Sequence, residues 1–274
     1  MYRLIALDVD GTLLNPQWRV TPETKAAITK AREQGVRVVL ATGRSWQEAE
    51  HLVPLSGCDS LMVCQGGATV ADCTQQRNLR RWTLPREQAL AAMSALEAHG
   101  FGMMVFVGDG LVVDRRGDEM FQAYEAPGFH KYKEVVEHLP AFLAGNDLPV
   151  NKIYAQTDDL DQFSQVAPHL EGLDGLCLTS SGWNNIEILP KGVDKGTALK
   201  ALAEMLDIPM EETAGIGDSD NDLGLFSAVS MSIAMGNAPD YVKKQAKRIT
   251  GSNAENGAAA AILSLLEENK NHSV

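Results

Sequence analysis

An apolar run near the start of the chain closes on two carboxylates that are separated by a single residue. The run begins at Leu4, and Asp8 and Asp10 precede Gly11 and Thr12 at its end. Side chains alternate along a strand, so both carboxylates can point toward the same place. Two carboxylates in a small space repel each other unless a cation or a shared proton relieves them. The pattern therefore predicts a metal site or a nucleophile beside an acid/base, although a hairpin turn at Asp10 and Gly11 also accounts for it.

The overall composition limits the class of protein. A chain of 274 residues can form one large domain or two moderate ones, and an apolar fraction of 45% is ordinary for a globular protein. The net charge of -12 argues against nucleic acid or an anionic membrane as a partner. No apolar stretch approaches the roughly 20 residues that span a membrane, and the cysteines lack metal-site spacing. We therefore predict a cytoplasmic protein without a nucleic-acid or membrane partner; the sequence does not indicate its oligomeric state.

The first third of the chain predicts a parallel sheet. Apolar runs typical of buried strands alternate with amphipathic segments, and turn residues such as Gly35 separate them. Near-continuous apolar strands with helices between them indicate a parallel sheet that is covered on both faces. We expect strands at 3–9, 36–41 and 61–64, a helix that begins at Thr21 and Pro22, and a second helix at 46–52.

The middle of the chain follows a different pattern. From about Thr83, strand-like runs follow one another with fewer helices between them, and a loop-rich stretch contains Pro127, Gly128 and Pro140. Consecutive strands favour an antiparallel sheet with helices on one face. After Pro190 the alternation of helices and strands returns. We therefore predict an α/β fold in which a parallel-sheet core, residues 1–83 and 191–274, carries an inserted α+β domain, residues 84–190.

A second acidic cluster, residues 217–222, follows an apolar strand expected at 213–217. It shares the opening of an EF-hand calcium loop, but Leu223 occupies the position where that loop needs glycine. It also shares two glycines with dinucleotide-binding loops, but Asp220 replaces the third glycine and would repel a pyrophosphate. A Mg²⁺ site with room for a substrate phosphate remains, beside the alternative of a solvated acidic helix start. We expect a helix from about Asp218, with Asn221 and Asp222 on one face.

Residues suited to binding a charged ligand, either polar side chains or glycines, follow the ends of several predicted strands. Because ligands of open parallel sheets bind beyond the carboxyl ends of the strands, we expect these residues to meet at one rim. They are Asp8, Asp10, Thr42, Gly43, Gly66, Gly67 and Asp218. An anion bound there needs positive charge, and Lys195 supplies it at a glycine-flanked helix start, where backbone N–H groups also favour anions. Lys191 fits a solvated surface charge.

Four motifs stand in order along the chain: Asp8-x-Asp10-Gly11-Thr12, Thr42-Gly43-Arg44, Lys195, and Gly217-Asp218-x-x-Asn221-Asp222. This set resembles the haloacid dehalogenase superfamily. Because the insert lies between the second and third motifs, and an Ala234-Met235-Gly236-Asn237-Ala238 stretch follows, the chain is similar to Cof-type phosphatases with a C2-type α/β cap. The resemblance covers essentially the whole chain, and four ordered motifs are more specific than any one of them. It implies a Rossmann-like core and a cap that selects the substrate.

The resemblance also implies roles for individual residues. Asp8 would be the nucleophile that attacks phosphorus and forms an aspartyl-phosphate, and Asp10 would protonate the leaving oxygen and then activate water. A Mg²⁺ cofactor would be held by Asp8, the backbone carbonyl of Asp10, Asp218 and Asp222. The phosphoryl oxygens would be bound by Thr42, Gly43, Lys195 and Asn221, with Lys195 also catalytic because negative charge builds beside it.

The implied function is a Mg²⁺-dependent phosphatase that hydrolyses small phosphorylated metabolites. A sugar phosphate is the default substrate, with nucleotides or cofactor phosphates such as pyridoxal phosphate as alternatives. Related folds include phosphomutases, which pass the phosphoryl group to a sugar hydroxyl instead of water. A non-catalytic phospholigand-binding protein is the third possibility, and fold alone does not separate the three. The presence of nucleophile, acid/base, lysine and metal carboxylates argues against the non-catalytic alternative.

The chain departs from the family pattern after the third strand. Many relatives carry Asn-Gly-Ala where this chain has Gly66, Gly67 and Ala68, so an Asn side chain is missing, and Gln65 is a candidate substitute. Substrate choice is expected to lie in the cap. The candidate leaving-group contacts there are Trp183, Asn184 and Glu187, although Trp183 can equally pack the hinge. Arg44 can either contact the substrate or brace its own loop.

Overall fold

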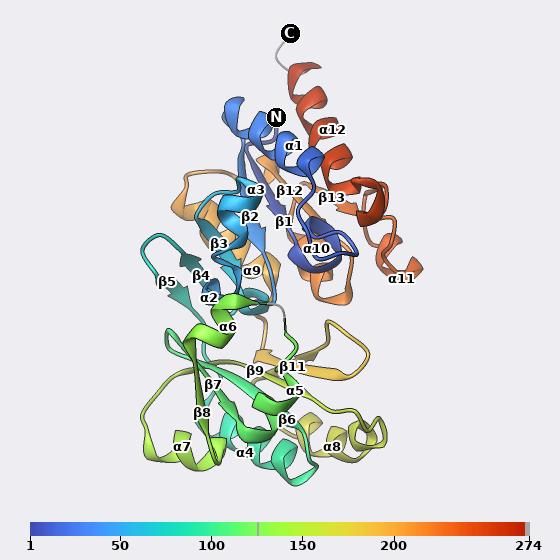
Figure 1. The fold of residues 1–274 in the computed structure, drawn as a ribbon. Coiled ribbons are helices and arrows are strands. Elements are labelled where there is room, and N and C mark those ends of the chain that lie inside the picture. The colour runs from blue at the N-terminus through green and yellow to red at the C-terminus, as the bar shows by residue number, and fades with distance from the viewer. Residues whose placement is uncertain (125, 272–274) are drawn as a thin grey trace.

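A computed structural model describes residues 1–124 and 126–271 of the chain. The described residues form two sheets that lie one above the other in Figure 1. The first is the core sheet, and its order is β14-β13-β12-β1-β2-β3-β4-β5. Strands β14 to β3 in this order pair in parallel, whereas β4 pairs antiparallel with both β3 and β5. The strands are β1 (Leu4–Leu7), β2 (Arg37–Ala41), β3 (Leu61–Cys64), β4 (Thr69–Asp72), β5 (Arg77–Arg81), β12 (Thr213–Gly217), β13 (Met231–Ala234) and β14 (Arg248–Ile249).

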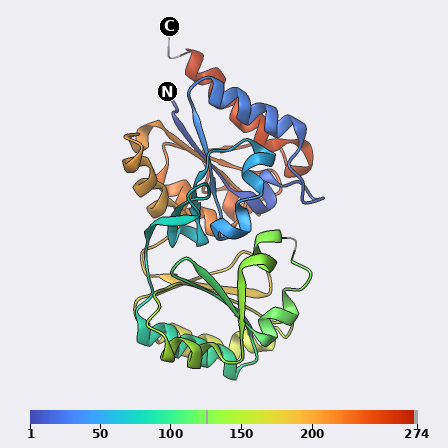
Figure 2. The same ribbon diagram turned by 60° about the vertical axis from the view of Figure 1, so that its left-hand side comes forward.

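Helices cover both faces of the core sheet, as the apolar strands predict. Along β1, Ile5 and Leu7 pack on one face, whereas Leu4 and Ala6 pack on the other. Because helices bury the side chains on both faces of the sheet, every residue of the strand is apolar. One face holds α1 (Pro22–Glu33), α2 (Trp46–Ala49), α3 (Leu52–Ser56) and α12 (Gly257–Asn271), and the other holds α9 (Lys195–Met205) and α10 (Leu223–Ala228). The short α11 (Asp240–Lys243) follows β13. Helices α1 and α12 run side by side in Figures 1 and 2.

The second sheet is the cap sheet, with the order β10-β11-β9-β6-β7-β8. Its strands are β6 (Gly102–Val107), β7 (Gly110–Asp114), β8 (Lys133–Val136), β9 (Val150–Gln156), β10 (Leu176–Thr179) and β11 (Asn185–Pro190). On the face away from the core lie α4 (Arg86–Ala98), α7 (Leu139–Gly145) and α8 (Asp161–Glu171), as Figure 2 shows. On the face toward the core lie α5 (Arg115–Met120) and α6 (Pro127–Tyr132).

The cap differs in three respects from the expected antiparallel sheet with helices on one face. Helices lie on both faces of the sheet, since α5 and α6 lie on the face toward the core. Strands β7 and β8 are parallel, so the sheet is mixed. The stretch expected to be loop-rich contains α5, α6, β8 and α7. Its prolines stand at the first turns of α6 and α7, where a missing backbone N–H costs nothing. Pro127 and Pro140 therefore start short helices here and do not mark a loop.

Local sequence signals are confirmed at the start of the first core helix but are wrong or missing at two other core elements. Thr21 caps α1 by accepting a hydrogen bond from the Thr24 N–H over 3.2 Å. The helix expected at 46–52 is broken into α2 and α3. The hairpin of β4 and β5 has no counterpart in the predicted elements, because β5 is a mostly exposed, arginine-rich strand that lacks an apolar pattern.

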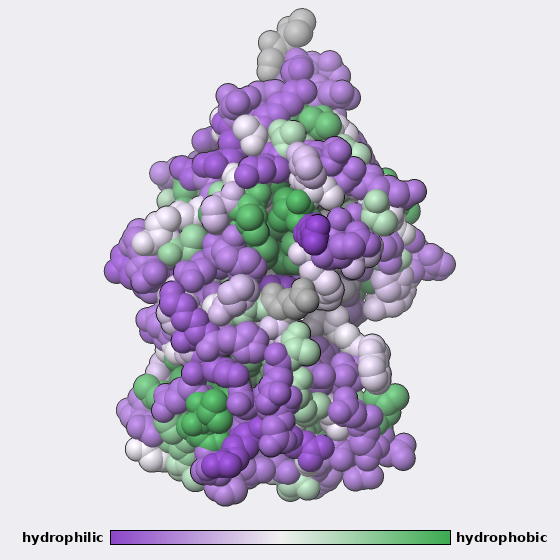
Figure 3. Space-filling model, in the orientation of Figure 1, coloured by the Kyte–Doolittle hydropathy of each residue, from purple (hydrophilic) through white to green (hydrophobic). Residues whose placement is uncertain are grey.

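The chain leaves the core sheet after β5 and returns to it after β11, so the second domain is inserted into the first. The inserted α/β architecture is therefore as predicted, while the boundaries at 83/84 and 190/191 stay a prediction. The face of the molecule in Figure 3 is mostly hydrophilic, with a hydrophobic patch just above the junction of core and cap. Among the described helices, none has the length and apolar character that crossing a membrane requires.

Candidate active site

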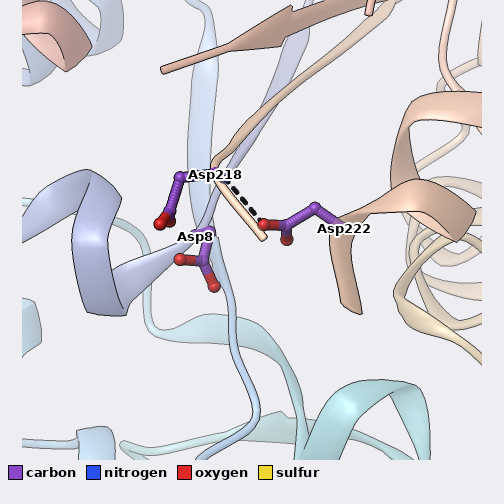
Figure 4. Close-up of side chains that lie close together, drawn as sticks. All are labelled: Asp8, Asp218 and Asp222. Atoms are coloured by element: carbon purple, nitrogen blue, oxygen red, sulfur yellow. Dashed lines mark hydrogen bonds between the residues drawn. The ribbon is translucent and has the colours of Figure 1, made fainter. Parts of the chain in front are cut away.

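The ends of two neighbouring parallel strands bring the two acidic motifs together. Asp8 follows β1 and Asp218 follows β12, and the Asp8 N–H donates to the Ile216 carbonyl over 3.0 Å. Figure 4 shows the carboxylates of Asp8 and Asp218 close to each other, with Asp222 beside them. One carboxylate oxygen of each of the three residues lies within 4.8 Å of the others. The two motifs do meet at one rim of the sheet, as predicted.

Lys195 is the first residue of α9, and its side chain is fully buried between two of these carboxylates. Its Nζ donates to Asp8 Oδ1 over 2.6 Å and to Asp222 Oδ1 over 2.7 Å. The helix begins there because the Asp194 side chain accepts from the Thr197 N–H over 2.7 Å. Charge-assisted hydrogen bonds are the strong ones, so Lys195 fixes the Asp8 carboxylate relative to Asp222.

The local structure after Asp218 differs from the expected helix. Residues Asp220–Asp222 form a short 3-10 turn, and α10 begins only at Leu223. The reason is that Asp222 Oδ2 accepts hydrogen bonds from the N–H groups of Asp218 and Ser219, over 2.9 and 3.0 Å, which ties the turn back to the end of β12. Lys195 donates to the other oxygen of Asp222, Oδ1, so both carboxylate oxygens of Asp222 already accept hydrogen bonds. These hydrogen bonds orient Lys195 and the backbone of Asp218.

A tight turn places a second group of contacts on Asp218. The Thr12 hydroxyl donates to Asp218 Oδ1 over 2.8 Å. Gly11 has a φ of +88°, and a Cβ at this position would lie 2.3 Å from Asp218 Oδ2. The turn therefore requires glycine for both its backbone angle and its close approach to the carboxylate.

Three clustered carboxylates and one lysine leave the site with excess negative charge. Burial raises the pKa of Asp8 well above its ordinary value; Lys195 opposes this rise, while Asp222, Asp218 and Asp10 add to it. Burial and the neighbouring Asp222 raise the pKa of Asp218 to about 6. A divalent cation held by Asp8 and Asp218 would relieve this repulsion, and carboxylate oxygens are ligands that Mg²⁺ prefers. The cluster therefore fits the expected metal site, with Asp222 the least free to bind a metal directly.

We expect the affinity for Mg²⁺ to fall as the pH is lowered through about 6, the pKa of Asp218 in the absence of metal. Below that pH the Asp218 carboxyl is protonated, and its proton must leave before the group can bind a metal. One competing proton weakens the apparent affinity by roughly 10-fold for each pH unit below the pKa. Calorimetric titration of metal-free protein with MgCl₂, at pH values on both sides of 6, measures the effect; an affinity that does not change with pH would contradict it.

Asp10 is held by Arg44. The Arg44 Nε donates to Asp10 Oδ2 over 3.0 Å, and Nη2 donates to Oδ1 over 2.6 Å. The guanidinium lies 5.4 Å from the ring centroid of Tyr124 in the cap. Burial alone would lower the pKa of Arg44. The neighbouring Tyr124 and Asp10 outweigh burial and raise this pKa overall, so the Arg44 side chain stays charged. Arg44 also lines the cavity described below, so its two expected roles, contact with the substrate and bracing of its own loop, both stay predictions.

The loop after β2 is contacted from the cap. Lys152 on β9 donates from Nζ to the Gly43 carbonyl over 3.0 Å, and the same Nζ lies 2.7 Å from Glu187 Oε2 on β11. Both side chains are almost completely buried. Burial alone would raise the pKa of Glu187. The nearby Lys152 outweighs burial and lowers this pKa overall, so the two side chains form an ion pair. The ion pair thus ties the cap sheet to the predicted phosphoryl-binding loop of the core.

Thr42 is predicted to contact the phosphoryl group, and its observed contacts do not test this. It is fully buried, and its hydroxyl accepts a hydrogen bond from the Arg44 N–H over 3.1 Å. Gly43, the next residue, lines the cavity described below. In the described structure Thr42 therefore shapes the loop, and Gly43 presents the loop's backbone to the site.

The turn after β3 requires its second glycine. Gly67 has a φ of +108°, and a Cβ there would lie 2.0 Å from the Asp194 carbonyl oxygen, directly before Lys195. Gly66 has a φ of +70°, and a Cβ there would lie 3.2 Å from Leu189 Cδ1 in the cap. The position where relatives often carry Asn therefore faces the cap. The candidate substitute Gln65 is buried and is not among the described residues that line the cavity.

Replacing Gly67 with Ala should lower the free energy of unfolding by about 2–6 kcal/mol, since left-handed strain and overpacking each cost about 1–3 kcal/mol. The matched control is Gly35→Ala, because Gly35 has a φ of +79° and a Cβ there would have no atom of the described residues within 4 Å. That control carries the left-handed strain alone, about 1–2 kcal/mol. Urea denaturation of both variants measures how much free energy of unfolding each one loses. Equal losses would show that the Asp194 carbonyl moves to make room for the added Cβ.

A cavity of about 420 Å³ joins these groups and lies between core and cap. Of the predicted site residues, five line it: Asp8, Asp10, Gly43, Asp218 and Asn221. Of the three candidate leaving-group contacts, Asn184 and Glu187 line it as well. Trp183 is 74% exposed and is not among the described lining residues. The hydroxyl of Ser219 donates to Asn221 Oδ1 over 3.0 Å, which leaves the Asn221 amide beside the cavity.

Sequence reasoning missed several residues of this site: Trp18, Tyr124, Lys152, Tyr154, Ser181 and Asn237. Lys152 carried a signal, because it is a lysine within the otherwise largely apolar strand β9. Asn237 lies inside the stretch that is typical of the Cof-type subfamily, and its Nδ2 donates to the Gly11 carbonyl over 2.9 Å. The others gave no local signal, since their importance depends on where the cap closes over the core.

Comparison with known proteins decides the family. The sequence model of the haloacid dehalogenase-like hydrolases matches residues 5–262. The chain belongs to this family. It is 29% identical to phosphatase YwpJ of Bacillus subtilis, over 96% of this chain and all of that protein. It is 30% identical to 5-amino-6-(5-phospho-D-ribitylamino)uracil phosphatase YwtE of the same organism, over 96% of this chain and 98% of that protein.

The fold agrees with this assignment. A solved haloacid dehalogenase-like hydrolase from B. subtilis superposes with a TM-score of 0.84 at 28% identity, covering 95% of this chain and 98% of the other. The family member described here is therefore of the Cof type, with the cap inserted between the second and third motifs. Its curated relatives over the full length are phosphatases, which places this chain among the phosphoric monoester hydrolases of the family.

Proposed function

We propose that this family member is a Mg²⁺-dependent phosphatase that hydrolyses small phosphorylated metabolites through an aspartyl-phosphate on Asp8. The observation that carries the proposal is the position of the Asp8 carboxylate. It lies at the end of β1, held by Lys195, within 4.8 Å of an Asp218 oxygen, and it lines a cavity that the cap covers. A nucleophile needs this combination of fixed orientation, counter-charge and restricted access to water.

The chemistry then follows from these residues. A carboxylate oxygen of Asp8 attacks phosphorus, the bond from phosphorus to the ester oxygen breaks, and Asp10 gives its proton to that oxygen. Water, deprotonated by Asp10, next attacks the same phosphorus, and the Asp8 carboxylate leaves as inorganic phosphate forms. Lys195 and the amide of Asn221 stabilise the phosphoryl oxygens as charge builds. When bound by Asp8, the Asp10 carbonyl and Asp218, Mg²⁺ supplies positive charge that offsets the repulsion between phosphate and carboxylates.

The finer substrate class stays a prediction. A sugar phosphate is the default expectation, and the named relatives do not settle it, because YwtE acts on a ribityl phosphate that carries a uracil ring. A phosphomutase uses the same Asp8 chemistry and differs only in the acceptor of the phosphoryl group. Full-length similarity to phosphatases favours water as the acceptor.

The proposal is tested by phosphate release from a panel of phosphorylated metabolites, with MgCl₂ and with excess EDTA. We expect release that requires the metal. Product analysis by phosphorus NMR distinguishes hydrolysis from an isomerised sugar phosphate, which would indicate a mutase. If no compound yields phosphate or an isomer while a phosphorylated ligand still binds, the result favours the non-catalytic alternative or a substrate outside the panel.

A further inference from the structure

One wall of the cavity beneath the cap is apolar and aromatic. It includes Met104, Phe106, Phe121, Tyr124 and Tyr154, and polar cap residues line the rest of this part of the cavity. The rings of Phe121 and Tyr154 pack edge to face with their centroids 5.6 Å apart. Phe129, which is fully buried behind them, packs in the same manner against Phe121 and Tyr124. Such edge-to-face contacts hold the rings in fixed positions, so the wall is a preformed aromatic surface.

The polar side chains around this wall are largely bonded to one another. The Tyr154 hydroxyl donates to Gln156 Oε1 over 3.1 Å, and the Ser181 hydroxyl donates to Glu187 Oε1 over 2.5 Å. Asn185 uses both ends of its amide. Its Oδ1 accepts from the N–H groups of Ser181 and Gly182, and its Nδ2 donates to Ser181 Oγ. The cap lysine at this wall, Lys152, is likewise engaged by Glu187 and the Gly43 carbonyl.

This pairing bears on which leaving group fits. A sugar buries several hydroxyl groups, and each one needs a hydrogen-bond partner from the site. Here many of the polar side chains would have to exchange a partner that they already have. An aromatic leaving group makes no such demand, because its faces and edges contact the rings directly. The wall therefore favours a flat, weakly hydrogen-bonding group over a polyhydroxylated one.

Trp18 adds a further ring at the cavity, from the core side. It lines both this cavity and the adjoining apolar groove, and its side chain is 57% exposed. Its φ is +57°, a left-handed conformation that a bulky residue rarely adopts. The turn is held by Asn15, whose Oδ1 accepts from the N–H groups of Gln17 and Arg19, each over 3.0 Å. A turn that holds a tryptophan backbone in this conformation, where glycine would be the easier choice, is a signal of function at the site.

We propose that this cavity selects phosphate monoesters whose leaving group is a planar aromatic or heteroaromatic alcohol, and that Trp18 is a specificity-determining residue. The proposal rests on the phosphatase function proposed above and names the substrate class of that same site. The aromatic wall of the cap contacts the leaving group from one side, and the Trp18 indole contacts it from the core side. The cavity volume of about 420 Å³ suits a ligand of one or two rings beside the phosphate.

The test compares three esters that share a primary alcohol as the leaving group: benzyl phosphate, cyclohexylmethyl phosphate and glucose 6-phosphate. The first two are similar in size and both apolar, so their difference reports on planarity, while glucose 6-phosphate reports on hydroxyl groups. We expect kcat/KM for benzyl phosphate to exceed that for glucose 6-phosphate by about 10- to 100-fold, the range that one aromatic stacking contact supplies. Cyclohexylmethyl phosphate should fall between the two.

Substitutions at Trp18, with a control at Trp183, test whether Trp18 causes the preference for benzyl phosphate. Trp18→Gly removes the ring and suits the left-handed backbone, so the fold is retained; it should lower kcat/KM for benzyl phosphate about 10-fold, and by more than for glucose 6-phosphate. Trp18→Phe keeps a ring and should recover most of the loss. Trp183→Ala is the matched control, because that indole is 74% exposed on the cap and is not among the described lining residues. It should leave the ratio between the three esters unchanged.

The outcomes separate this inference from the proposed function. Metal-dependent release that is as fast from glucose 6-phosphate as from benzyl phosphate would overturn the aromatic preference and leave the phosphatase standing. Equal losses for all three esters in Trp18→Gly would overturn the role of Trp18 in selection. If none of the esters, nor any metabolite of the wider panel, releases phosphate, the phosphatase proposal itself fails, and the inference fails with it.

Discussion

Replacing Asp8 with Asn should lower kcat by at least about 10⁴-fold, the usual scale for the loss of a covalent nucleophile. The amide that replaces the carboxylate is a far weaker nucleophile, so the aspartyl-phosphate cannot form. The fold should persist, since Lys195 keeps Asp222 as a partner at 2.7 Å. Because burial raises the pKa of Asp8, its ionised form is disfavoured in the folded protein, and removing that charge does not cost stability at neutral pH.

The matched control for this change is Asp220→Asn, which removes the same charge from an exposed residue of the acidic cluster. Steady-state kinetics with MgCl₂ measures turnover, and acid quenching with a radiolabelled phosphoryl group traps the covalent intermediate. Wild type and Asp220→Asn should retain the label on the protein, whereas Asp8→Asn should not. Substantial Mg²⁺-dependent turnover by Asp8→Asn would show that another group attacks phosphorus.

Replacing Lys195 with Met should lower the free energy of unfolding by about 3–5 kcal/mol in the absence of metal. The side chain is 0% exposed and carries the positive charge that hydrogen-bonds to both Asp8 and Asp222. Methionine fills nearly the same volume but leaves two buried carboxylates facing each other without this partner. Removal of one member of a buried ion network is costly because the remaining charges are desolvated and uncompensated.

Urea denaturation in EDTA, at neutral and acidic pH, measures this loss. The difference between Lys195→Met and wild type should shrink as the pH is lowered, because Asp8, whose pKa burial raises well above its ordinary value, then becomes protonated. Lys200→Met is the control, since Lys200 is exposed on the same helix α9. If the two variants unfold at the same urea concentration, Lys195 does not support the carboxylates. We also expect kcat/KM of Lys195→Met to fall, since the phosphoryl oxygens lose its charge.

Part of this protein was determined by local sequence. The parallel core sheet was predictable because strands buried on both faces must be apolar throughout, as Leu4–Leu7 is. The metal and nucleophile cluster was predictable because Asp8 and Asp218 each interrupt such a strand at its carboxyl end, where parallel strands share one rim. The start of α1 at Thr21 and Pro22 followed from capping chemistry, which involves only neighbouring residues.

Other parts were decided only by the tertiary structure. Strand β8 pairs in parallel with β7, although the consecutive strands of the cap favoured an antiparallel sheet. Asp222 folds back onto the end of β12 and so prevents the helix expected from Asp218. For both the cap sheet and the segment after Asp218, the local sequence predicted one structure, and a contact between separate elements stabilised a different one.

The closure of the cap depends on contacts that no sequence window contains. Lys152 meets the Gly43 carbonyl across 109 positions of the chain, and Arg44 meets the Tyr124 ring of the inserted domain. Trp183 looked like a leaving-group contact because it stands near the return to the core, yet Trp18, far away in sequence, lines the cavity. A sequence pattern predicts which side chains lie on the same face of a single strand or helix. Which of them face one cavity is set by how the core and the cap pack against each other.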